Sequence, residues 1–294
     1  MSLAPLLASP TLSMTLKVTM HVYSGRPDPF FYLPADGAQE LVERIGRIST
    51  ESSVPPPGKA GGLGYRGFSI GFVDSPLSWF VHEGIVDLGH AAENLMEGGR
   101  EIEQWLFDVG STVWGSVVGS HVADSLAKPA QPGSSSAGSG GCPRCNAVDA
   151  PPLNLAIWNT PTVQPKNNCY NYANNQMTNT FAQPGNASGK PITSESCSGV
   201  QPSAESDGLV ATSNFSGALA KNQGFYVALV IWPGEDFHWY RQDSNGCWSH
   251  KPGKTAARNT DNKGAAISDP KTCDRGPYTD FCSFMITKST VKIS

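Results

Sequence analysis

The spacing of apolar residues predicts an N-terminal unit that mixes strands and helices. Residues 16–23 alternate between apolar and polar side chains, which is typical of a strand with one buried face. Residues 35–48 place apolar side chains three and four positions apart, as on one face of a helix. Residues 65–73 predict a second strand, and residues 87–127 predict mostly helix, interrupted by glycines. The pattern therefore predicts a small α+β unit.

The C-terminal half carries a different pattern, dominated by strands. Residues 225–232 form a continuous apolar run, which predicts a buried strand, and a hairpin follows over residues 237–250. Residues 280–286 and 291–293 predict closing strands. Residues 167–177 are compatible with a short helix. We therefore expect an α+β domain in which one short helix packs on an antiparallel sheet.

A stretch rich in proline, glycine and serine separates the two patterns. Residues 129–141 have the composition of a flexible linker, and we expect them to lack regular structure. The predicted division is an N-terminal recognition or regulatory unit over residues 1–128, a linker with a Cys-Pro-Arg-Cys motif over residues 129–151, and a C-terminal domain over residues 152–294.

The hairpin brings two histidines together if its turn has the length that the sequence indicates. Ser244-Asn245-Gly246 is a turn signal, and a three-residue loop with a left-handed glycine pairs Tyr240 with His250. Because strand side chains repeat every two residues, His238 shares the face of Tyr240 and hence that of His250. A loop of two or four residues would separate the histidines onto opposite faces.

Cys169 precedes this hairpin and begins the predicted short helix. A thiolate at a helix start is stabilised by the unpaired N–H groups there, which predicts a lowered pKa. A cysteine nucleophile needs a base and the base needs an orienting group, and His238 and His250 fit these two roles. Gln164 is a candidate donor to an oxyanion, together with the N–H of Cys169. The alternatives are a buried structural cysteine, structural histidines and a solvated loop glutamine.

A cysteine at a helix start, followed by a sheet that bears a histidine and then a second polar residue, is the plan of papain-like peptidases. Residues 155–290 resemble their NlpC/P60 branch, in which a second histidine follows the base histidine by twelve positions, as His250 follows His238. The motifs Asn-Cys-Tyr-Asn-Tyr-Ala at 168–173 and Trp-Ser-His-Lys-Pro-Gly at 248–253 also resemble an uncharacterised bacterial family. The resemblance implies a papain-like domain, with the nucleophile helix packed on an antiparallel sheet.

Seven cysteines leave six once Cys169 is set aside as a nucleophile. These six could form three disulfides in an oxidising compartment or remain reduced thiols in the cytoplasm. Because residues 1–7 read as a frayed leader rather than a signal peptide, we expect reduced thiols and a cytoplasmic location. Cys142 and Cys145 could form a disulfide, share a zinc site with Cys273 or Cys282, or be idle.

The bulk composition excludes several classes of partner. A net charge of −4 argues against nucleic-acid binding, and no apolar run reaches the roughly 20 residues of a membrane-spanning helix. Neither a cofactor nor a metal site is expected from the motifs. The oligomeric state is left open.

The expected function is a cysteine-dependent hydrolase that cleaves a peptide or amide bond through an acyl-enzyme, in a bacterial, protease-like setting. An acyl transferase with the same residues, in which an amine replaces water, is one alternative. A non-catalytic peptide- or glycan-binding module is another. A disulfide-stabilised secreted structural protein is the third.

Overall fold

A computed structural model describes residues 15–48, 62–72, 78–87, 95–97, 99–128 and 141–294. The chain forms two compact units, which are described one at a time. The first unit comprises Met1–Met20, Pro29–Pro56 and Gly67–Trp114, and the second comprises His21–Asp28, Pro57–Arg66 and Gly115–Ser294. The predicted start 1–7 and nearly all of the predicted linker 129–141 lie outside the described residues.

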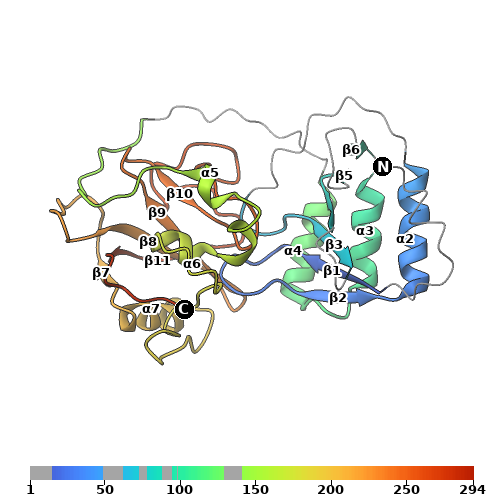
Figure 1. Ribbon diagram of the computed structural model, residues 1–294, viewed down its shortest axis with the longest axis horizontal. Helices are drawn as coiled ribbons and strands as arrows, with labels where there is room; N and C mark the ends of the chain where they lie inside the picture. The colour runs from blue at the N-terminus through green and yellow to red at the C-terminus, as the bar shows by residue number, and fades with distance from the viewer. Residues whose placement is uncertain (1–14, 49–61, 73–77, 88–94, 98, 129–140) are drawn as a thin grey trace. The chain divides into compact units, whose positions relative to one another are not determined.

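The first unit is built on a six-stranded antiparallel sheet with the order β2-β1-β3-β4-β5-β6. Its strands are β1 (Leu16–Met20), β2 (Phe30–Leu33), β3 (Phe68–Phe72), β4 (Ser78–His82), β5 (Ile85–Asp87) and β6 (Leu95–Glu97). Helices α2 (Ala35–Arg47) and α3 (Gly99–Val109) lie side by side (Figure 1). The predicted alternation is confirmed in β1, whose Leu16, Val18 and Met20 are buried.

The prediction of mostly helix over residues 87–127 is wrong at its beginning. β5 and β6 pair in antiparallel fashion there, with Val86 opposite Met96, and helix begins only with α3. Strands of three residues are too short to show a period that differs from that of a helix. A second helix, α4 (Ser116–Leu126), belongs to the second unit. The division at residues 128 and 152 stays a prediction.

The second unit contains a five-stranded sheet with the order β10-β9-β8-β11-β7. Its strands are β7 (Val210–Thr212), β8 (Phe225–Trp232), β9 (Asp236–Gln242), β10 (Trp248–His250) and β11 (Asp280–Thr287). The helices are α4, α5 (Leu155–Trp158), the 3-10 turn η2 (Gln164–Lys166), α6 (Cys169–Ala173) and α7 (Cys197–Ser206). Every residue of β8 and β9 is buried, as expected for strands covered on both faces. The α+β class is thus confirmed.

Two predicted elements are shorter than expected or absent. The helix predicted over residues 167–177 is the five-residue α6, which ends because Asn175 has a φ of 53°, in the left-handed region. Residues 291–293 are not a strand, although Val291 and Ile293 are buried. Apolar residues there fill the core without joining the sheet, and an apolar pattern alone does not distinguish the two roles.

Two disulfides close long loops in the second unit. Cys142 is bonded to Cys247 beside the hairpin turn, and Cys197 at the start of α7 is bonded to Cys282 in β11. The expectation of reduced thiols is therefore wrong. Since Cys142 is bonded to Cys247, the Cys-Pro-Arg-Cys motif supplies one half of a long-range disulfide rather than a bond within itself. Cys145, Cys169 and Cys273 are free.

Candidate functional site

The β9–β10 hairpin has the predicted register. Tyr240 lies opposite His250, and the N–H of Asp243 donates to the carbonyl of Cys247 at 2.9 Å, which closes a three-residue loop. Gly246 has a φ of +88°, as the turn requires. His238 and His250 therefore share one face, as predicted.

The two histidines are hydrogen-bonded in an arrangement that fixes their protons. His250 Nε2 lies 3.1 Å from the carbonyl oxygen of Thr260, which can only accept, so Nε2 carries the proton. In the neutral ring Nδ1 is then bare and accepts from His238 Nε2 at 2.9 Å. His238 Nδ1 is consequently unprotonated, and among the described residues it has no hydrogen-bond partner.

Burial keeps both imidazole rings neutral. It lowers the pKa of His250 to about 3, and the nearby Arg258 acts in the same direction. It also lowers the pKa of His238 well below its usual value, assisted by His250 and Arg66. Tyr240 stacks on the His250 ring at 4.9 Å between centroids. His238 is thus a neutral base with a free lone pair.

Cys169 begins α6, whose first turn is capped by the preceding residue. The Asn168 side chain accepts from the N–H groups of Tyr170 and Asn171, and the Asn171 side chain accepts in return from the N–H of Asn168. The thiol is fully buried, and burial raises its pKa well above the usual value, as does the Asp236 carboxylate. The expectation of a lowered pKa is therefore wrong, because burial outweighs the effect of the helix start.

The thiol lies against β9 but is not bonded to the histidines. Its Sγ is 4.0 Å from the carbonyl oxygen of Phe237, next to His238 in the strand. Helix α6 packs on the face of β9 that carries Trp239, through a ring contact with Tyr170 at 5.3 Å. Strand side chains alternate, so this face is opposite to that of His238. The structure thus brings the histidines together and places the thiol beside their strand.

Gln164, the predicted oxyanion donor, takes part in two hydrogen bonds, and its role at an oxyanion stays a prediction. Its side-chain Nε2 donates to the carbonyl of Lys254 at 3.2 Å, and its own carbonyl accepts from Lys251 Nζ at 2.6 Å. The glutamine therefore ties η2 to the loop after β10.

Lys251, which the sequence pattern did not single out as a site residue, is fully buried. Its ammonium group donates to three carbonyl oxygens, those of Gln164, Asn167 and Gly253, at 2.5–2.6 Å. Burial lowers its pKa to about 7, while the Cys169 thiol acts in the opposite direction. The signal in the sequence that could have marked this lysine as a site residue was its position directly after His250.

Asp236 is a second residue that sequence reasoning missed. Its buried carboxylate accepts from the backbone N–H groups of Ser24, Gly25 and Arg26 and from the hydroxyl of Tyr278. Burial raises its pKa to about 6, although these four donors act to lower it. Asp236 lies two residues before His238 in β9, so strand alternation places both side chains on the same face. This spacing was the signal in the sequence that could have found it.

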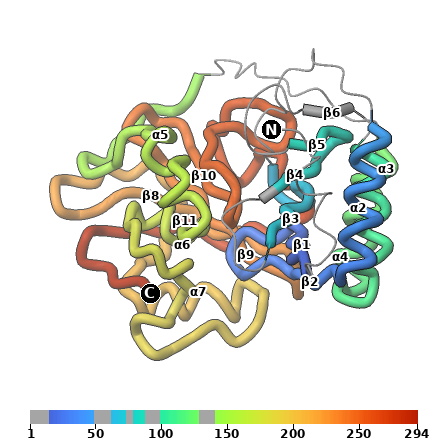
Figure 2. Tube along the Cα trace, turned by 45° about the vertical axis from the view of Figure 1, so that its right-hand side comes forward, coloured from blue at the N-terminus to red at the C-terminus, as the bar shows by residue number. Residues whose placement is uncertain are grey.

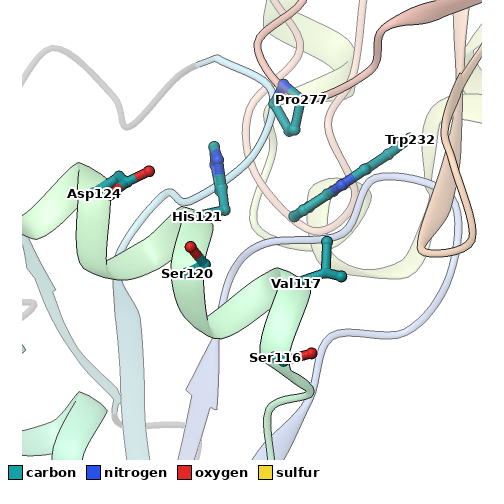
Figure 3. A pocket seen from close by; sticks show the side chains of 7 residues that line it. All are labelled: Ser116, Val117, Ser120, His121, Asp124, Trp232 and Pro277. Atoms are coloured by element: carbon teal, nitrogen blue, oxygen red, sulfur yellow. The ribbon is translucent and has the colours of Figure 1, made fainter.

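A separate hollow of about 560 Å³ lies where α4 approaches Trp232 and Pro277 (Figure 3). The His121 ring meets the Trp232 ring edge-on at 5.1 Å between centroids. Burial lowers the pKa of His121, whose Nε2 accepts from the N–H of Tyr65 at 3.3 Å. The hollow shares no lining residue with the Cys169 region.

The fold and the cysteine pairing define a disulfide-linked α+β protein. No family model matches the chain, and no solved structure matches it. The chain belongs to the same family as insoluble matrix shell protein 1 of the mollusc Ruditapes philippinarum. The two are 51% identical over 130 residues, which span 44% of this chain and 84% of that protein.

This kinship corrects two expectations. The relative is a eukaryotic shell matrix protein, so the description as a bacterial thiol protease is wrong. A shell matrix lies outside cells, and the two disulfides fit an oxidising compartment, so the cytoplasmic location is also wrong. No helix of the described residues is both long and apolar enough to cross a membrane.

Proposed function

We propose that this protein is a secreted structural component of an extracellular matrix. The observation that carries the proposal is its 51% identity to an insoluble shell matrix protein over 84% of that protein's length. The two disulfides support it, because such bonds persist in extracellular proteins and are rare in the cytoplasm.

The architecture of the second unit suits a long-lived matrix component. One disulfide ties Cys142 to the hairpin that follows β9, and the other ties α7 to β11. Each link removes conformational entropy from the unfolded chain and contributes roughly 2–4 kcal/mol. Strands β8 and β9 of the sheet are buried throughout, so these two strands are shielded from solvent and proteases.

Fractionation of the producing tissue tests the location. Cell lysate, secreted fluid and insoluble extracellular material would be analysed by mass spectrometry for peptides of this chain. The proposal predicts that they are concentrated in the insoluble extracellular fraction. Recovery of the chain mainly from the lysate would contradict it.

A second candidate function is acyl transfer at Cys169, on a peptide or amide substrate. It is favoured by the free Nδ1 lone pair of His238 and by the contact of the thiol with the carbonyl of the preceding residue, Phe237. It requires Sγ and the His238 ring to come within hydrogen-bond distance, although α6 packs on the opposite face of β9. In this proposal Sγ attacks the substrate carbonyl, His238 takes the thiol proton, and His250 holds the ring of His238. The proton passes to the leaving amine as the thioester forms. An acceptor amine then attacks the thioester and forms a new amide, and the proton that it loses returns through His238 to Sγ.

Variants of the three residues test this candidate with a peptide-amide assay. Cys169→Ala and His238→Ala should each abolish turnover, because nucleophile and base take part in bond making. His250→Ala should leave a residual rate, since it only orients the base. A folded Cys169→Ala variant with full activity, or a wild-type protein without any, would rule the candidate out.

A further inference from the structure

Residues 21–28 form a compact loop that is closed by its own carboxylate. They follow β1 in the chain and lie beside β9 (Figure 2). Asp28 accepts from the N–H groups of Val22 and Tyr23 at 2.9 Å each and from His21 Nδ1 at 2.9 Å. The hydrogen bond from His21 holds the pKa of Asp28 below its usual value, against the effect of burial. The loop therefore keeps its shape through internal bonds.

The centre of this loop is held through its backbone rather than its side chains. The N–H groups of Ser24, Gly25 and Arg26 donate to the Asp236 carboxylate at 2.5, 3.2 and 3.0 Å. The carbonyl oxygen of Gly25 accepts from Asn168 Nδ2 and Gln183 Nε2, both at 2.8 Å. The Asp236 carboxylate and the two side-chain amides thus bind the backbone of one glycine and its two neighbours.

The position of Gly25 admits no larger residue. A Cβ atom on Gly25 would lie 2.3 Å from Cε2 of Phe237, well inside van der Waals contact. Phe237 is fully buried, and its carbonyl oxygen is the one that contacts the Cys169 thiol. The Phe237 ring therefore excludes any side chain at position 25, and only glycine fits there. The same phenylalanine contacts the thiol through its carbonyl oxygen.

Two further residues of the loop make side-chain contacts, one two positions before the glycine and one directly after it. They are a tyrosine and an arginine, and their partners are acidic residues. Tyr23 donates through its hydroxyl to Glu235 at 3.2 Å. Arg26 Nη1 donates to the Glu235 carbonyl at 2.8 Å and lies 3.5 Å from a Glu195 carboxylate oxygen. Its guanidinium also stacks over the Tyr23 ring at 4.8 Å.

We propose that Asp236, Asn168, Gln183 and Phe237 form a binding site for glycine-centred peptides, and that residues 21–28 are its tethered occupant. The ligand class is a peptide with an aromatic residue two positions before the glycine and a basic residue directly after it. The occupant is bonded to Asn168, the residue before Cys169, so we expect its displacement to make the thiol more accessible. A second copy of the segment, supplied in trans, competes for the same site. The proposal concerns binding and holds whether or not Cys169 is catalytic.

The first test is the rate at which Cys169 reacts with a thiol reagent in the folded protein. Gly25→Ala should displace the loop and raise that rate by about tenfold or more, a change that corresponds to 1.4 kcal/mol or more in the opening equilibrium. Gly119→Ala is the matched control, because a Cβ at Gly119 would meet nothing within 4 Å. Mass spectrometry would separate Cys169 from the partly exposed Cys145 and Cys273.

The second test uses the peptide His-Val-Tyr-Ser-Gly-Arg-Pro-Asp, which has the sequence of residues 21–28. Added to the Gly25→Ala variant, it should slow Cys169 labelling towards the wild-type rate. The same peptide with alanine in place of glycine should not. Equal protection by the two peptides, or no protection by either, would overturn the proposal.

The test also works if Gly25→Ala does not fold. Arg26→Ala removes only a half-buried side chain and its bonds to Glu195 and Glu235, so the body should remain intact. It should raise the Cys169 labelling rate severalfold, and the glycine peptide should reverse the effect. Unchanged labelling in a folded Gly25→Ala or Arg26→Ala variant would show that the loop does not occupy the site as proposed.

Discussion

Asp236 couples the contact with residues 21–28 to pH. Burial raises its pKa to about 6, whereas an aspartate in the unfolded chain has a pKa near 3.9. Between about pH 4 and pH 6 the native state therefore binds more protons than the unfolded state. The contribution of this group to the free energy of unfolding falls as pH rises through that window.

Asp236→Asn should remove this pH dependence. A shift of about two pKa units corresponds to up to about 3 kcal/mol, so the stability of the wild type relative to the variant should fall by that much between pH 4 and pH 7. Urea unfolding of both proteins at several pH values measures the difference. A difference that stays constant with pH would contradict the raised pKa.

His250 should act with the opposite sign. Burial lowers its pKa to about 3, while an unfolded histidine titrates near 6.5, so the stability it contributes is present above pH 6.5 and is lost as pH falls towards 3. Between pH 6.5 and pH 5 this group alone should cost the wild type roughly 2 kcal/mol. His250→Asn should be less stable at pH 7 yet show a flatter acid profile in urea unfolding. An equally steep profile would show that His250 does not remain neutral in the native state.

The histidine pair was predictable and the loop site was not, for a physical reason. His238 and His250 are twelve residues apart, and the turn between them fixes their register by local rules. Asp236 meets Ser24 across 212 residues of sequence, and no periodicity in either segment encodes that contact. The raised pKa of Cys169 was equally hidden, because it depends on burial by distant parts of the chain.

At the scale of elements, the β9–β10 hairpin depends on one glycine. Gly246 has a φ of +88°, and a Cβ there would lie 1.8 Å from the carbonyl oxygen of Pro143. Gly246→Ala should therefore lower the free energy of unfolding by roughly 2 kcal/mol or more, through backbone strain and the clash. Gly115→Ala, where a Cβ meets nothing within 4 Å, is the control in a thermal or urea melt. Equal stability of the two variants would show that the turn is not under this constraint.

The length of an element decided whether the sequence pattern could predict it. The alternation in β1, the helical spacing in α2 and the apolar run of β8 each extend over at least one full period, and all three were predicted. β5 and β6 have three residues each, and α6 has five. Partners in the tertiary structure rather than local propensity decide such short segments.

For the whole molecule, the pairing of cysteines was the largest open question in the sequence. Seven cysteines allowed many arrangements, and spacing did not choose among them. The partners lie 105 and 85 residues apart, in segments that only the folded sheet brings together. Reduction of both bonds should therefore lower the thermal midpoint markedly, because each contributes roughly 2–4 kcal/mol. Calorimetry with and without reductant measures this, and an unchanged midpoint would contradict it.

The most direct test of a secreted, disulfide-linked protein is a disulfide map of the chain isolated from its native source. The protein would be alkylated under denaturing, non-reducing conditions, digested and analysed by mass spectrometry. We expect the linked pairs Cys142–Cys247 and Cys197–Cys282, with alkylation confined to Cys145, Cys169 and Cys273. Alkylation of all seven cysteines would contradict this expectation and would return the protein to a reducing compartment.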